Sequence, residues 1–188
     1  MPTRYSSPLA VLLTVAVCFG ATGRAAAQGN NEFRSMPLDQ ITRWLADSLP
    51  PATQLSYVRT DYDDEGTFRI NAAIQVLSMR FAGCSLEYQE RLTINSEPPD
   101  TRTHAANLAD LSQVVTVVQA SRPDDVEIPK GRWWAVLLRD AASRDRITSS
   151  GTQTAGRALA IFQVLDGTMA KRLANAFSAA IERCGGSA

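Results

Sequence analysis

The chain is poor in the residues that most often carry chemistry, and it has no net charge. Its 188 residues include one histidine, His104, and only three cysteines. Basic and acidic residues number 19 each, and nearly all the basic ones are arginine. A single histidine excludes a zinc site built from several histidines. The balanced charge gives no electrostatic reason to bind nucleic acid or an anionic membrane.

The sequence also lacks the common catalytic and cofactor motifs. It contains no Gly-X-Ser-X-Gly elbow, no Walker loop and no dinucleotide fingerprint. We therefore predict no cofactor and no metal. The acidic stretch from Asp61 to Gly66 resembles the front of a calcium loop, but the glutamate required at the twelfth position would fall on Ala72. A solvated hairpin turn explains this stretch without a metal, and the solitary His104 is expected at the surface of a polar loop.

Only one long apolar run occurs, and it lies near the start of the chain. The run Leu9–Phe19 follows Arg4 and precedes the small residues Ala25-Ala-Ala27. This pattern predicts a signal peptide over residues 1–27 and a periplasmic or secreted mature protein. The run is shorter than the roughly 20 residues of a membrane-spanning helix, so no stable membrane insertion is expected after cleavage. Lipid attachment at Cys18, inside the run, is the less favoured alternative.

The mature segment has the size of one domain. Arg4 and Arg24 leave with the signal, which changes the balance to 17 basic against 19 acidic residues. Residues 28–34 are polar and are predicted to be a disordered lead-in. Residues 35–188 are predicted to form a single globular α+β domain that is long enough to bury a core. They contain no internal repeat and no linker long enough to divide them.

Two cysteines, Cys84 and Cys184, remain after cleavage. In an oxidising compartment a lone pair is most simply a disulfide, so we predict that these two are bonded. A redox-active pair is the alternative, but the Cys-X-X-Cys spacing typical of such pairs is absent.

Hydrophobic periodicity indicates an α+β fold. Apolar residues recur at helical spacing over 38–49 and again over 169–184, where Asp166 or Thr168 can cap the helix. Between these helices about seven strands are expected, at 55–62, 68–81, 84–94, 114–119, 133–138, from Ile147, and at 158–164. The alternation changes phase at Val76-Leu77, which predicts a β-bulge or a bend. Residues 95–103 are expected to form a polar loop.

Four short motifs lie at the ends of the expected elements: Phe81-Ala-Gly-Cys84, Leu108-Ala-Asp-Leu111, Trp134 at a strand start, and a final helix ending in Arg183-Cys-Gly-Gly186. With the order of the elements, they resemble uncharacterised exported bacterial proteins with a pleckstrin-homology-like fold. The resemblance implies a bent antiparallel β-sandwich or barrel, with a helix plugging one open end, and no assigned activity. Phosphoinositide-binding members carry a basic cluster in the first hairpin, where this chain is acidic. The alternative is an α+β fold resembling secretion chaperones, with a helix inserted at Thr103–Leu111.

Three tryptophans are candidates for a ligand or partner surface: Trp44, Trp133 and Trp134. Neighbouring residues of a strand point to opposite faces, so Trp133 and Trp134 cannot share one. One indole is therefore expected in the core, and the other is exposed or covered by the N-terminal helix that carries Trp44. Internal packing is the favoured interpretation, whereas an uncovered indole would mark a contact surface.

Together these features predict an exported, non-catalytic binding or interaction module for an apolar small molecule or a protein. The alternative function is a carboxylate-based hydrolase acting on cell-wall or glycan material. It requires two carboxylates on opposite sides of a cleft, drawn from Asp110, Asp124, Asp125 and Glu127. A purely structural role in the cell envelope fits the same sequence features, so the sequence does not separate it from the binding role.

Overall fold

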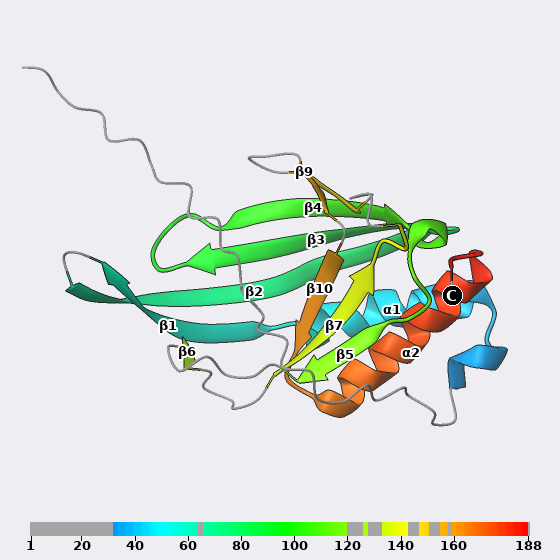
Figure 1. The fold of residues 1–188 in the computed structure, drawn as a ribbon, viewed down its shortest axis with the longest axis horizontal. Coiled ribbons are helices and arrows are strands. Elements are labelled where there is room, and N and C mark those ends of the chain that lie inside the picture. The colour runs from blue at the N-terminus through cyan, green and yellow to red at the C-terminus, as the bar shows by residue number, and fades with distance from the viewer. Residues whose placement is uncertain are drawn as a thin grey trace, which may run out of the picture.

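The computed structural model describes residues 32–63, 66–119, 126–127, 133–142, 147–150, 155–157 and 159–187. The predicted signal peptide and residues 28–31 lie outside this part. The described residues form the predicted α+β fold, with an N-terminal helix, a C-terminal helix and two antiparallel sheets (Figure 1). The two sheets face each other as layers of a sandwich, and α1(Leu38–Ala52) and α2(Gly167–Arg183) pack together at one end of it.

The larger sheet has seven strands in the order β6-β1-β2-β3-β4-β8-β9. These strands are β1(Leu55–Asp63), β2(Gly66–Ala82), β3(Ser85–Ile94), β4(Asp100–Asn107), β6(Val126–Glu127), β8(Ile147–Ser150) and β9(Ala155–Arg157). The register between β2 and β3 shifts between Val76 and Ser78, which confirms the predicted bulge. A bulge increases the local twist of a strand, so the 17-residue strand β2 can bend over the core.

The smaller sheet has the order β10-β7-β5 and is apolar on both faces. It consists of β5(Thr116–Gln119), β7(Trp134–Arg139) and β10(Leu159–Val164). On one face, Val136 and Leu138 contribute to the main core with α2. On the other face, Ala135 and Leu137 form a second cluster with Leu55 from β1. Burial on both faces explains why β7 is a continuous apolar run rather than an alternating one.

Strand β4 corrects two expectations. Residues 95–103 were expected to be a polar loop, but the strand begins at Asp100 and pairs with β3 along its length. The alternative helix at Thr103–Leu111 is also wrong, because this stretch contains the end of β4 and the short 3-10 helix η2(Leu108–Asp110). The chaperone-like architecture is therefore excluded for the described residues.

Helix α1 packs on the inner face of β2 through Ile41, Leu45 and Leu49, which are fully buried. Their spacing produces one apolar stripe on the helix. Pro50 and Pro51 lie inside its last turn rather than beyond its end. Proline has the φ angle of a helix, so the chain completes this turn although each ring removes an N–H donor.

Helix α2 covers the smaller sheet and contacts α1. Asp166 caps it, since its Oδ1 accepts hydrogen bonds from the backbone N–H groups of Thr168 (2.7 Å) and Met169 (3.1 Å). The first residue of the helix is Gly167, and a Cβ there would lie only 2.6 Å from Cε2 of Trp134. Glycine thus permits the start of α2 to lie directly against the indole. Neither described helix is long and apolar enough to cross a membrane.

The described chain begins with the 3-10 helix η1(Glu32–Ser35), inside the predicted disordered lead-in. Phe33 is only 1% exposed, and its ring centroid lies 4.7 Å from that of Trp44. Glu32 forms an ion pair with Arg172 of α2 at 2.9 Å. The prediction of disorder is therefore wrong for residues 32–34, because one buried aromatic ring anchors this otherwise polar segment to the core.

Candidate binding recess

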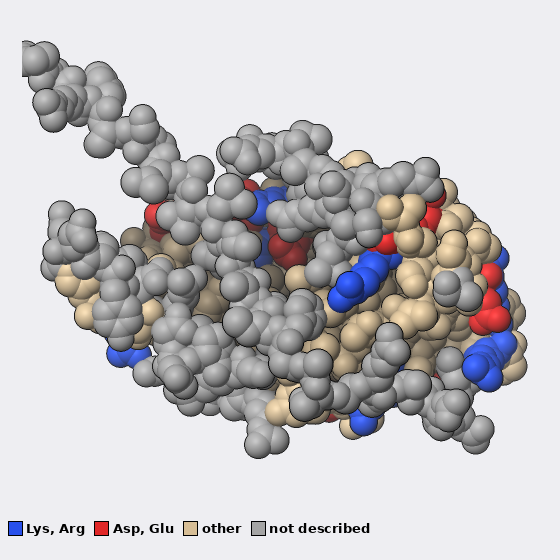
Figure 2. Space-filling view, viewed as in Figure 1, with Lys and Arg blue, Asp and Glu red and all other residues tan. Residues whose placement is uncertain are grey.

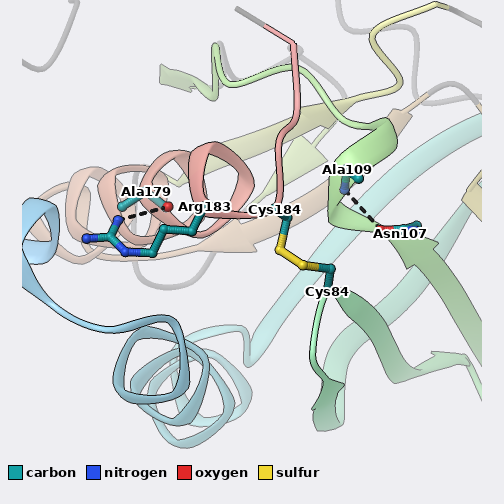
Figure 3. The surroundings of a disulfide bond; sticks show 6 residues. All are labelled: Cys84, Asn107, Ala109, Ala179, Arg183 and Cys184. Atoms are coloured by element: carbon teal, nitrogen blue, oxygen red, sulfur yellow. Dashed lines mark hydrogen bonds between the residues drawn. A yellow bond between two sulfur atoms is a disulfide. The ribbon is translucent and has the colours of Figure 1, made fainter.

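A disulfide joins one end of the larger sheet to the end of α2. The Sγ atoms of Cys84 and Cys184 lie 2.09 Å apart, with the Cα atoms 5.7 Å apart. Cys84 lies in the tight turn between β2 and β3, after Gly83 with φ +58°, and Cys184 directly follows α2. Figure 3 shows the bond joining the helix end to this turn. The structure thus brings together the two cysteines that the sequence predicted to pair.

The same turn holds the short helix η2 in place. The N–H of Leu108 donates to the carbonyl oxygen of Cys84 at 2.8 Å, and the Leu108 side chain is fully buried. Oδ1 of Asn107 accepts a hydrogen bond from the N–H of Ala109 at 3.0 Å and caps η2 (Figure 3). The β2–β3 turn and η2 are therefore one connected unit, fastened to α2 by the disulfide.

A recess of about 610 Å³ lies beside this unit, where β2, β3, β4, β8 and η2 meet. Small side chains line much of it: Ala82, Ser85 and Ala105. Polar side chains also contribute: Arg80, Glu87, Asn107, Asp110 and Thr148. The recess forms because the short side chains on adjacent strands leave space between the longer side chains around them.

The strand register places one row of these residues across the sheet. Arg80 lies opposite Glu87, Glu87 lies opposite Ala105, and Ala105 lies opposite Thr148. Directly opposite residues point to the same face, so this row borders the recess on the outer side of the sheet. Arg80 and Glu87 are both exposed, and within the described residues no ion pair joins them. The recess therefore presents a guanidinium and a carboxylate with free hydrogen-bonding capacity.

His104 lies on the opposite, inner face of the sheet, which corrects the expectation of a surface residue. It is 2% exposed, and its ring stacks on that of Tyr88 with centroids 4.6 Å apart. Its Nε2 lies 4.0 Å from Oε1 of Glu90. The ring contacts continue from Tyr88 to Phe162 (5.1 Å) and from Phe162 to Phe177 of α2 (5.4 Å). His104 thus lies at one end of a row of contacting rings that continues through Tyr88 and Phe162 to Phe177.

None of the three candidate tryptophans lines the recess. Trp133 is 8% exposed in the second apolar cluster, and Trp134 packs against the main core and Gly167. Trp44 packs against Phe33, with the guanidinium carbon of Arg172 5.0 Å from its ring centroid. These positions fit the favoured interpretation of internal packing.

Of the carboxylates named for the alternative hydrolase, the structure places two, Asp110 and Glu127, and these lie far apart. Glu127 lies on the edge strand β6 and pairs with Val58 of β1, whereas Asp110 follows β4. Four strand spacings between β6 and β4 correspond to about 19 Å across the sheet. Asp124 and Asp125 lie outside the described residues. Asp110 instead lines the recess together with Glu87.

The acidic stretch 61–66 falls at the β1–β2 hairpin. Asp63 pairs with Gly66, whose φ is +132°, and residues 64–65 lie outside the described part. Among the described residues, no group of three His, Cys, Asp or Glu side chains lies close enough to hold a metal ion. On the face shown in Figure 2, basic and acidic atoms of the described residues are interspersed rather than gathered into a patch of one sign.

Sequence reasoning missed the recess because five separate elements form it. Only the pairing of β3 with β4 brings Ala105 beside Glu87, and β4 was not recognised. A usable signal was present, since Ala82, Ser85 and Ala105 are small residues on strand faces that also carry Arg80 and Glu87.

Comparison of the chain with protein-family models, curated proteins and solved structures gives no match, so the pleckstrin-homology-like resemblance stays a prediction.

Proposed function

We propose that the protein is an exported, non-catalytic binding module that takes its ligand in the recess beside the disulfide. The observation that carries this proposal is the recess itself. Its volume of about 610 Å³ falls within the roughly 300–1,000 Å³ typical of small-molecule sites. Its frame is rigid, because the disulfide and the Leu108–Cys84 hydrogen bond hold the turn and η2 together.

Export is supported by the N-terminal sequence and by the cysteine pair. A positive start, an apolar run and small residues before Gln28 are typical of a signal peptide. Disulfides persist in oxidising compartments, so a cysteine pair at bonding distance fits a periplasmic or secreted protein.

The character of the ligand differs from the first expectation of an apolar molecule. A wholly apolar ligand would remove Arg80 and Glu87 from water without giving them hydrogen-bond partners, which costs free energy. A ligand with polar groups satisfies both side chains. Asp110 and Glu127 lie on distant parts of the sheet, too far apart to act as the two carboxylates of a hydrolase.

Two measurements test this proposal. The first is native mass spectrometry of protein from an exporting host, without reductant. The expected mass is that of Gln28 to Ala188 less two hydrogens. A mass that retains residues 1–27 or carries acyl chains on Cys18 contradicts the proposed soluble export.

The second measurement tests ligand binding directly. The ¹⁵N-labelled mature protein is screened by NMR against a library of polar, charged and apolar small molecules. We expect at least one compound to shift the amides of Ala82, Ser85 and Ala105 in a saturable way. The Glu87→Ala variant should weaken that binding. If no compound moves these amides, the recess is not a ligand site and the proposal is wrong.

A further inference from the structure

The recess combines apolar and polar surface in a way that restricts its ligand. The methyl groups of Ala82 and Ala105 contribute apolar surface. Arg80 and Glu87 place one cation and one carboxylate side by side at the same hollow. A pair of opposite charges gives no net attraction for a polyanion.

The hydrogen-bonding groups of the recess include both donors and acceptors. The Arg80 guanidinium can only donate, and the Glu87 carboxylate can only accept. Thr148 Oγ1 donates to the carbonyl oxygen of Ala105 at 3.3 Å, so its lone pairs remain available to accept. Asn107 Oδ1 is occupied by the N–H of Ala109, so its amide group remains available to donate.

Hydroxyl groups are the partners that suit such a set, because each can donate and accept at once. A sugar ring presents hydroxyls around its edge and C–H groups on its faces, which match the polar side chains and the alanine methyl groups of the recess. We infer that the recess binds a neutral, hydroxyl-rich ligand, namely a sugar unit of a glycan. This inference rests on the proposed function and names the ligand class of the same site.

The test titrates the ¹⁵N-labelled mature protein with three neutral tetrasaccharides: fully N-acetylated chitotetraose, cellotetraose and maltotetraose. At least one of them should shift the amides of Ala82, Ser85 and Ala105 saturably. Removal of a charged hydrogen-bonding partner by Arg80→Ala or Glu87→Ala should weaken the binding about tenfold. Both side chains are exposed, so these variants are expected to fold.

Arg91→Ala is the matched control. Arg91 lies on the same strand and the same face as Glu87, is exposed, and does not line the recess. Its removal should change the affinity for the tetrasaccharide by less than twofold. A loss equal to that of Glu87→Ala would mean that the sugar contacts the sheet elsewhere, which overturns the inference.

Parallel titrations with inorganic phosphate and with benzyl alcohol separate this inference from the proposed function. If either of these moves the recess amides and no tetrasaccharide does, the ligand class is wrong while a ligand site remains. If no tetrasaccharide moves them, the inference is overturned whatever the other probes do. Failure of the whole compound library then contradicts the proposed function as well.

Discussion

Removal of the disulfide should cost the protein several kcal/mol of stability. The double variant Cys84→Ala/Cys184→Ala opens a loop whose ends are 100 residues apart in sequence. The bond restricts the unfolded chain, and for a loop of this length the lost chain entropy corresponds to about 4.7 kcal/mol at 25 °C. Native-state strain and residual structure in the unfolded chain usually reduce this value, so we expect a loss of about 2–4.7 kcal/mol.

Urea unfolding at equilibrium, followed by tryptophan fluorescence, measures this loss. The oxidised protein and the double variant are compared without reductant, and the reduced wild-type protein serves as the control that keeps both sulfur atoms. The reduced protein and the double variant should unfold at similar urea concentrations, well below the oxidised protein. The free energy of unfolding should fall more steeply with urea concentration when the bond is absent, since the unfolded chain then exposes more surface.

A loss below about 1 kcal/mol would refute this reasoning. It would mean either that the two cysteines are not bonded in solution or that the unfolded chain is already as compact as the bond makes it. Counting free thiols in the unfolded wild-type protein separates these explanations, because a bonded protein has none among Cys84 and Cys184.

Four single substitutions test the docking of η1 and the start of α2. Phe33→Ala should destabilise the protein by about 3–5 kcal/mol, since it removes a fully buried ring. An effect below about 1 kcal/mol in urea unfolding would show that η1 does not dock in solution. Gly167→Ala should cost about 1–3 kcal/mol despite the better helix propensity of alanine, because its Cβ would collide with Trp134. Equal or higher thermal stability of that variant would contradict the close contact. Asp166→Ala should cost about 1 kcal/mol through loss of the α2 cap, and Asp166→Asn should recover most of it; identical melting of all three proteins would argue against the cap.

The sequence predicted those features that local patterns determine. The phase change at Val76-Leu77 located the bulge, and the apolar stripes located both helices, because each signal is contained in a few neighbouring residues. The order of elements also predicted two antiparallel layers with a helix at each end of the chain. The cysteine pair followed from the number of cysteines and the expected export alone.

The features that depend on distant contacts could not be predicted in this way. Strand β4 carries Thr101 and Thr103 on one face and Arg102 and His104 on the other, so it has no apolar alternation to reveal it. His104 becomes buried only because Tyr88 and β8 lie beside it in the folded sheet. The recess likewise exists only once β4 pairs with β3. One missed strand therefore accounts for both the misplaced histidine and the missed site.

The two ends of the described chain meet at one corner of the fold. Nη2 of Arg183 donates to the carbonyl oxygen of Arg34 at 2.6 Å across 149 residues of sequence, and in Figure 1 the C-terminal end lies close to η1. A short peptide linker could therefore join these ends, and the chain could be reopened at the exposed turn Asn95–Glu97. Such a circularly permuted protein would keep every strand pairing. It would also present its new termini at the far end of the sheet from the recess, which suits surface immobilisation with the recess free.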